Sequence, residues 1–184
     1  MVRLFVCIWI PDCLRERLIK FQGEIKTLPI KAKYVEPENM HLTVTFLGEV
    51  ENREIEPLKE RIEGALKDVN SFHVKLVGLK LIPNENYIRV IGINAKDDKE
   101  EISQLIRKIT GCIGGNFYES AKLTLCRVKY IKDRDILRKF FEKYRNVEVG
   151  EFEVKSVALV KSTLTGQGPI YETIHESFLK PLGS

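Results

Sequence analysis

Two short segments of the chain place a proton-exchanging or cationic side chain two residues before a threonine. The first is His41-Leu42-Thr43 and the second is Lys122-Leu123-Thr124. Because successive side chains of a β-strand alternate between its faces, the first residue of each segment and its threonine project to the same side. Histidine exchanges a proton near neutral pH, lysine is a cation, and a threonine hydroxyl can donate a hydrogen bond to an anion. The pattern predicts one polar row on each of two strands, available to a cleft.

Strict alternation also places the residues that come after each segment. Thr45 continues the first polar row, whereas Val44 and Phe46 face the core. In the second segment, Arg127 falls on the apolar side. It reaches the row of Lys122 only if the strand twists or bulges nearby.

The surroundings of the two segments repeat. HLTVTFLGEV at 41–50 precedes FHVKLVGL at 72–79, and KLTLCRVKYI at 122–131 precedes FEVKSVAL at 152–159, at nearly equal spacing. This repetition indicates an internal duplication. Since no linker rich in Pro, Gly or Ser separates the halves, we expect one domain over residues 1–184, with one curved sheet or two sheets meeting at a cleft.

Hydrophobic periodicity predicts the elements that position the two rows. Apolar or β-branched runs predict strands, and apolar residues at spacings of three and four predict helices packed on a sheet. The expected strands cover 4–10, 41–48, 72–79, 87–93, 122–130, 152–160 and 170–178. One helix is expected after Asp12, which can cap its N-terminus. The other expected helices cover 54–69, 98–113 and 133–144.

Composition restricts the class of protein. The chain has 184 residues, 43% of them hydrophobic and 30% charged, and a formal net charge of +4, which is compatible with a polyanionic partner without requiring one. The apolar run at 4–10 is too short to span a membrane, and no signal-peptide pattern follows it. The four cysteines form neither a CxxC pair nor a cluster with histidine. We therefore expect a cytoplasmic protein without a disulfide scaffold or a zinc site.

Four ordered segments together carry a family resemblance. They are KYVEPENMHLTVTFLGEV at 33–50, PNENYIRVIG at 83–92, GNF with KLTLCRVKYIKD within 115–133, and KSTLTGQGPIYETI at 161–174. With them the chain resembles the 2H phosphoesterase superfamily, and within it the RNA 2′,3′-cyclic phosphodiesterases, also called 2′-5′ RNA ligases. The resemblance implies an α+β fold of two lobes related by a pseudo-twofold axis, with antiparallel sheets lining a central cleft and helices packed outside.

The resemblance also implies roles for the residues that match its motifs. His41 is expected to be the general acid toward the leaving 3′ oxygen, which gives a 2′-phosphate, and Thr43, Thr124 and Arg127 are expected to bind the phosphate. The implied partner is RNA ending in a 2′,3′-cyclic phosphate, and the reverse 2′-5′ joining reaction is attributed to the family. Neither a metal nor a cofactor is expected, and we expect a monomer.

Lys122 departs from the family pattern, because it stands where the second histidine is expected. With an ordinary pKa of about 10.4, lysine is neutral in roughly one molecule in a few thousand at pH 7, so it is a poor general base. A charged Lys122 that binds the phosphate electrostatically is the favoured role. Burial, or a neighbouring cation such as Arg127, would lower the pKa, so a base role stays open. Gly92 is a smaller departure, since close relatives often place tryptophan there.

Two other functions fit the same residues. One is a binding module that holds an RNA end after losing effective catalysis. The other is a cyclic phosphodiesterase for a small nucleotide, because the motifs recognise the phosphate better than what is attached to it.

Several further residues are weaker candidates for the site. His175 shares a strand face with Tyr171 and is the more plausible substitute for the missing histidine, whereas His73 is expected on an exposed strand face. A Lys161-Ser162-Thr163 run could contact phosphate, although such clusters usually serve turns. Three aromatic residues could stack on bases, although aromatic strand residues usually fill cores: Tyr34, Phe46 and Tyr87.

Overall fold

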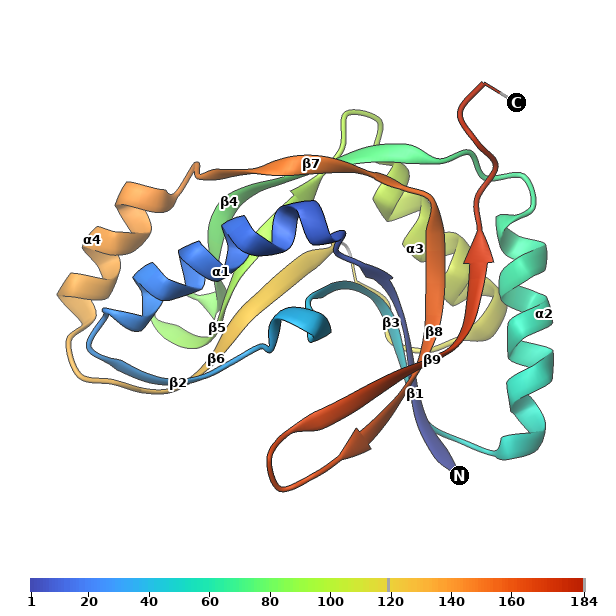
Figure 1. Ribbon diagram of the computed structural model, residues 1–184, viewed down its shortest axis with the longest axis horizontal. Helices are drawn as coiled ribbons and strands as arrows, with labels where there is room; N and C mark the ends of the chain where they lie inside the picture. Colours follow the sequence, from blue (N-terminus) through green and yellow to red (C-terminus); the bar gives the residue numbers. More distant parts are fainter. Residues whose placement is uncertain (119, 184) are drawn as a thin grey trace.

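A computed structural model describes residues 1–118 and 120–183, and within them nine β-strands join into one sheet with four α-helices outside it (Figure 1). The strands are β1 Val2–Trp9, β2 Ile30–Tyr34, β3 His41–Val50, β4 Phe72–Asn84, β5 Tyr87–Lys96, β6 Lys122–Ile131, β7 Glu148–Val154, β8 Ser156–Leu164 and β9 Pro169–Phe178. The helices are α1 Asp12–Lys26, α2 Ile55–Leu66, α3 Glu101–Ile113 and α4 Arg134–Tyr144, with short 3₁₀ turns at Pro37–Asn39 and Asn52–Glu54.

The sheet is antiparallel, with the strand order β7-β4-β5-β6-β3-β1-β8-β9, and β2 pairs with β6 outside this path. The strands divide into two lobes that we name by their motif residue. The His41 lobe holds β3, β1, β8 and β9, the Lys122 lobe holds β6, β5, β4 and β2, and β7 pairs with β4 at the boundary opposite the β3–β6 contact. A single residue pair, Leu42 with Leu123, joins the lobes between β3 and β6. The chain therefore builds one curved sheet instead of two separate ones.

The registers of the strands show the pseudo-twofold relation that the duplication predicts. Leu42 and Leu123 are the middle residues of the two motifs, and they pair with each other. His73 and Glu153 occupy equivalent positions in the two later segments, and they also pair with each other, between β4 and β7. A pair of equivalent residues maps onto itself when the lobes are exchanged, so the pseudo-twofold axis passes through both pairs.

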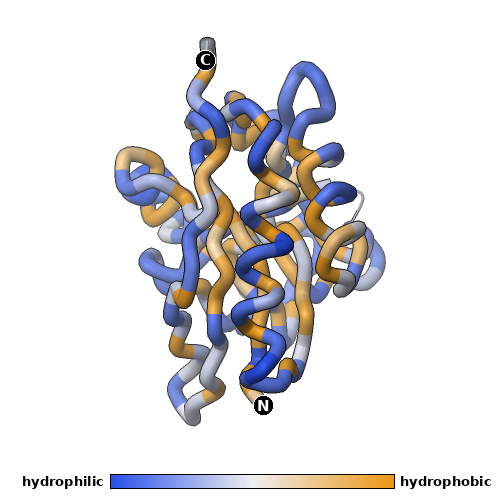
Figure 2. The backbone as a smooth tube through the Cα atoms, turned by 90° about the vertical axis from the view of Figure 1, so that its right-hand side faces the viewer, coloured by the Kyte–Doolittle hydropathy of each residue, from blue (hydrophilic) through white to orange (hydrophobic). Residues whose placement is uncertain are grey.

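The helices cover the outer face of the sheet. In the His41 lobe α2 contacts α3 and β9, and α3 contacts β3; in the Lys122 lobe α1 contacts β6 and β7, and α4 contacts β4 (Figure 1). Apolar residues concentrate on the central strands, while hydrophobic and hydrophilic residues are mixed along each helix (Figure 2). One large cluster of buried side chains lies between these layers and includes Leu42 and Leu123. No helix in the described part of the chain is both long and apolar enough to cross a membrane.

Two details of the predicted elements are wrong. The single strand expected at 152–160 is two strands, because β7 ends at Val154 and pairs with β4, whereas β8 begins at Ser156 and pairs with β1 and β9. Phe152 and Val154 before the break and Val157 and Leu159 after it belong to the large core cluster, so the alternation changes its phase near Lys155. Asp12 does not cap α1: Pro11 holds the cap position, and Asp12 pairs with Arg15 instead, at 2.9 Å.

Candidate active site

The two motif strands open onto one large cavity. Its volume is about 1100 Å³, and its wall includes all five residues that the sequence predicts for the site: His41, Thr43, Lys122, Thr124 and Arg127. Within each motif the central leucine is buried while its two neighbours are only half-buried. The alternation predicted within the two three-residue motifs is therefore confirmed. The cavity brings both rows to one place although they lie about eighty positions apart in the chain.

A bulge at the same position in each lobe determines which faces the residues after the motifs occupy. On β3, Thr43 and Thr45 pair with adjacent residues of β1, which leaves Val44 extra. On β6, Thr124 and Cys126 pair with adjacent residues of β5, which leaves Leu125 extra. An extra residue in one strand reverses the faces of the residues after it. Arg127 is consequently exposed and lines the cavity. The bulge is the condition under which the sequence predicted that Arg127 would reach the row of Lys122.

The same bulge makes two predictions for the first motif wrong. Phe46 lines the cavity and is 39% exposed, although strict alternation places it in the core. Thr45 does not continue the polar row; it is fully buried, and its hydroxyl donates to the carbonyl oxygen of Asn116 at 2.9 Å. Phe46 is therefore the counterpart of Arg127 in the other lobe.

His41 is held by one hydrogen bond and three aromatic rings. Its Nδ1 lies 2.7 Å from the carbonyl oxygen of Asn39, so Nδ1 carries the proton and Nε2 is the nitrogen available to a ligand. The ring centroids of Phe5, Trp9 and Tyr171 lie 5.1, 5.7 and 5.7 Å from that of His41. This arrangement fixes the plane of the imidazole.

The surroundings of His41 lower its pKa. Burial is the largest cause, because it disfavours the charged ring, and the positive charge of Arg127 adds to it. The hydrogen bond to Asn39 opposes both by favouring the charged form. The influence of Arg127 on His41 shows that the two motifs form one electrostatic unit.

Lys122 is half-buried at the start of β6, and its pKa is also lowered. Burial is the larger cause, and the positive charge of Lys80 on β4 is the second. The expectation that Arg127 would be the neighbouring cation is wrong, because Arg127 acts on His41 and Tyr171 instead. Lys80 was not among the residues predicted for the site.

Trp9 and Tyr171 also belong to the site without having been predicted for it. Trp9 pairs with His41 across β1 and β3, and its indole N–H donates to the hydroxyl of Thr173 at 3.0 Å. The Tyr171 ring also packs edge-on against Phe5, with centroids 4.9 Å apart. Tyr171 lies within one of the four resembling segments, which is the signal that could have identified it.

The remaining histidines do not replace the missing one. His175 Nε2 lies 2.8 Å from a carboxylate oxygen of Glu63 on α2, and His73 is exposed on β4. Neither residue lines the cavity. Among residues 1–118 and 120–183, no group of three or more His, Cys, Asp or Glu side chains is arranged to hold a metal ion.

The weaker candidates divide between the cavity and the surface. Tyr34 and Ser162 line the cavity. Lys161 forms an ion pair with Glu172 at 3.5 Å. Tyr87 is 55% exposed outside the cavity wall, with the Arg89 guanidinium 5.2 Å from its ring centroid.

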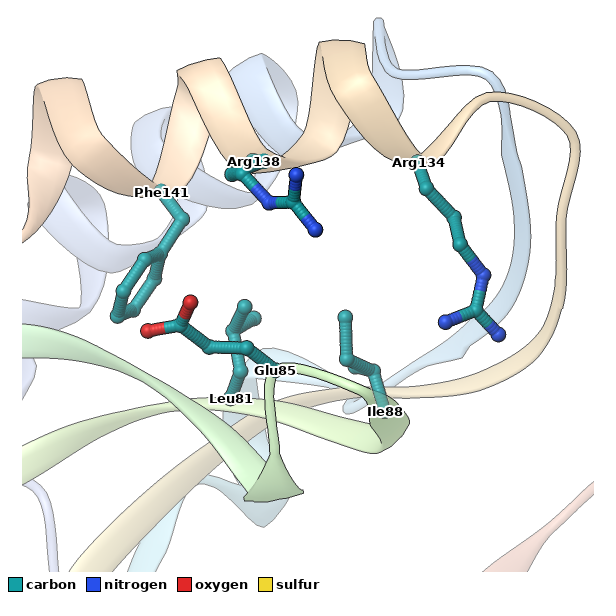
Figure 3. Close-up of a pocket in the computed structure, with 6 residues that line it drawn as sticks. All are labelled: Leu81, Glu85, Ile88, Arg134, Arg138 and Phe141. Carbon is teal, nitrogen blue, oxygen red and sulfur yellow. The ribbon is translucent and has the colours of Figure 1, made fainter.

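A second pocket, which shares no lining residue with the large cavity, lies between α4 and the β4–β5 hairpin (Figure 3). Its volume is only about 20 Å³, and six residues line it: Leu81, Glu85, Ile88, Arg134, Arg138 and Phe141. Arg134 donates to the carbonyl oxygen of Asn86 at 2.7 Å, which ties α4 to the hairpin turn. This pocket is too small to hold a nucleotide.

Gly92 is required by the close approach of β5 and β6, and we expect Gly92→Ala to lower the free energy of unfolding by about 2 kcal/mol. A Cβ at this position would meet the carbonyl oxygen of Leu123 at 2.5 Å, which is backbone and cannot rotate away. Urea unfolding measures the effect. Gly64→Ala on exposed α2 is the control, because a Cβ there meets nothing within 4 Å. It should instead stabilise the protein by about 0.5 to 1 kcal/mol. Equal stability of the two variants would contradict the packing argument.

Comparison with known proteins identifies relatives over almost the whole chain. Residues 8–92 match the family described as LigT-like phosphoesterase. A Methanocaldococcus jannaschii protein named RNA 2′,3′-cyclic phosphodiesterase is 40% identical, covering 95% of this chain and 99% of its own length. An Aquifex aeolicus protein of the same name is 34% identical, covering 97% of this chain and 98% of its own length. The crystal structure of a Thermus thermophilus protein superposes with a TM-score of 0.76 at 25% identity, covering 98% of this chain and 99% of that one.

Proposed function

The chain belongs to the LigT-like phosphoesterase family within the 2H superfamily, and from this premise we propose that it is an RNA 2′,3′-cyclic phosphodiesterase. The observation that carries the proposal is the shared cavity, in which His41 and Thr43 from one lobe meet Lys122, Thr124 and Arg127 from the other. We further infer that residues 1–184 form one domain, because the two lobes draw their strands from both halves of the sequence.

In the proposed reaction, a water oxygen attacks the cyclic phosphorus and the bond from phosphorus to the 3′ oxygen breaks. His41 donates its Nε2 proton to the departing oxygen, which leaves a 3′ hydroxyl and a 2′-phosphate. Its lowered pKa does not prevent this role, because a bound phosphate anion favours the charged imidazole. Binding of the substrate thus favours the protonated form of His41 that the reaction needs.

The cationic and hydroxyl groups bind the phosphate. Thr43 and Thr124 donate hydrogen bonds to its oxygens, and Arg127 adds charge-assisted ones. We assign Lys122 an electrostatic role, in which its ammonium stabilises the charge that develops on the phosphate oxygens. The proton of the attacking water passes to solvent or to a substrate oxygen. No step of this scheme uses a metal ion.

The size and the aromatic lining of the cavity suit an RNA end. Sites for small molecules commonly enclose about 300 to 1000 Å³. The cavity here has a volume of about 1100 Å³, and Tyr34 and Phe46 in its wall can stack on bases. Cations also outnumber carboxylates in the lining, since Arg3, Lys33, Lys122 and Arg127 stand against Glu36 and Glu38, which suits a polyanionic chain.

The function is tested with an RNA oligomer that ends in a 2′,3′-cyclic phosphate, incubated with the protein in EDTA and analysed for the product. We expect hydrolysis to a 2′-phosphate, faster than that of the corresponding cyclic mononucleotide. A 3′-phosphate product would contradict the assignment of His41 as the acid for the 3′ oxygen. Binding without any product would favour the binding module, and faster cleavage of the mononucleotide would favour the small-nucleotide enzyme.

A further inference from the structure

The strands beside the two motifs differ between the lobes at positions in register with the motif threonines. In the His41 lobe a row of paired residues runs from Thr43 on β3 through Cys7 on β1 to Ala158 on β8. Cys7 and Ala158 are buried in a small apolar cluster, against which Trp9 and Tyr171 pack. This lobe therefore presents an apolar floor behind its motif.

In the Lys122 lobe the same row runs from Thr124 on β6 through Gly92 on β5 to Lys80 on β4. Leu79 and Leu81 are buried in the core, so Lys80 between them points to the opposite face, which is the face of the cavity. A buried apolar residue in one lobe is thus replaced by a lysine in the other.

Gly92 contributes no side chain between Lys80 and the motif strand. Two strand spacings, roughly 10 Å, separate Lys80 from Thr124, and no side chain stands between them at Gly92. The four-carbon stem of Lys80 can therefore carry its ammonium over β5 toward the motif. The half-buried state of Lys80 agrees with a stem that lies along the sheet.

No carboxylate balances this charge in the described residues. Neither Lys80 nor Lys122 forms an ion pair there, and Lys80 is the charged group that acts on Lys122. The other charged groups and the histidine that line the cavity are Arg3, Lys33, Glu36, Glu38, His41 and Arg127, and neither glutamate forms an ion pair with Lys80 or Lys122. Two neighbouring ammonium groups without a counter-ion repel each other, which raises the free energy of the site. An anion bound between them would offset this repulsion.

We propose that Lys80 is a further phosphate-binding residue, which extends across β5 at Gly92 and forms a two-ammonium site with Lys122. The proposal rests on the proposed function in one respect, since it takes the bound anion to be the cyclic phosphate of an RNA end. The charge on Lys80 also favours loss of the proton from Lys122, as the second cause of its lowered pKa after burial.

The test compares Lys80→Met, which keeps the stem and removes the charge, with Lys75→Met, a matched control at an exposed lysine of the same strand that is not in register with the motif threonine and pairs with Glu151 of β7. Three quantities are measured: the Kd for inorganic phosphate by calorimetry, the titration of Lys122 by NMR of ¹³C-labelled lysine, and kcat/KM on cyclic-phosphate RNA. For Lys80→Met we expect a phosphate Kd about tenfold higher, a higher pKa of Lys122, and a kcat/KM about tenfold lower.

Lys75→Met should change none of the three by more than about twofold, and Lys80→Arg should restore most of the phosphate affinity, because it restores the charge. Wild-type values of phosphate Kd and Lys122 titration in a folded Lys80→Met protein would overturn the proposal. The two measurements that need no turnover separate it from the proposed function. If the natural protein binds phosphate through Lys80 but opens no cyclic phosphate, only the proposed function fails.

Discussion

Replacing His41 by alanine should lower kcat for opening a terminal 2′,3′-cyclic phosphate by about a thousandfold, within the range that general acid catalysis contributes. The loss is expected because the hydrogen bond to Asn39 and the three surrounding rings direct Nε2 to the ligand, and alanine provides no proton for the leaving oxygen. RNA binding should fall by no more than about threefold, since the charged groups remain. Single-turnover cleavage and equilibrium binding measure the two effects.

The matched control for this variant is His175→Ala, which removes a histidine bound to Glu63 outside the cavity. Its turnover should stay within about twofold of the natural protein. Unchanged turnover in His41→Ala would remove the acid from the mechanism. A large loss in His175→Ala at unchanged stability would instead make His175 the missing group.

The second large effect is expected at Lys122. Removing its charge with Lys122→Met should lower kcat/KM about a hundredfold. Losses of about this size follow when one strong electrostatic contact to a transition state is removed. Lys122→His should act in the opposite direction and raise the rate at least about tenfold, because it introduces a base where the family has one. If the natural protein is already fast and Lys122→His slows it, lysine is adapted as the catalyst and the electrostatic role fails.

The pH dependence of kcat/KM gives a second measurement of the same role, because it reports the free enzyme. His41 must carry its proton to act as the acid, so activity should fall as the pH rises through its lowered pKa, which is below about 6.5. An electrostatic Lys122 must also be protonated, so it adds a further loss at higher pH and no acidic limb. A bell-shaped profile with its rising limb removed by Lys122→Met would show that Lys122 acts as a base.

Alternation along a strand was sufficient to predict the centre of the site. His41, Thr43, Lys122 and Thr124 could be placed on one side of their strands from local spacing alone, and the structure places them there. Arg127 was predicted only on the condition of a bulge. Bulges depend on how neighbouring strands match, which a single strand sequence does not specify. Phe46 and Thr45 were placed on the wrong faces for the same reason.

The residues missed by the prediction all reach the site through pairing between distant strands. Lys80 is adjacent to the motif only because β4 pairs with β5 and β5 with β6. Tyr171 depends on β9 lying beside β8, and Trp9 on β1 lying beside β3. The break near Lys155 was missed because the segment is rich in strand-forming residues on both sides, and only the phase of its burial changes. Pairing of this kind is a property of the folded sheet.

The break between β7 and β8 also bears on the order in which the protein can fold during synthesis. β7 completes one edge of the sheet and β8, two residues later, starts the pairing with β1 near the other edge. The strands beside His41 therefore lack their last neighbours until residues 156–178 have left the ribosome, although β1 and β3 are among the first to be made. The catalytic side of the molecule is thus the last to be completed, and a nascent chain cannot assemble the full cleft before its final hairpin emerges.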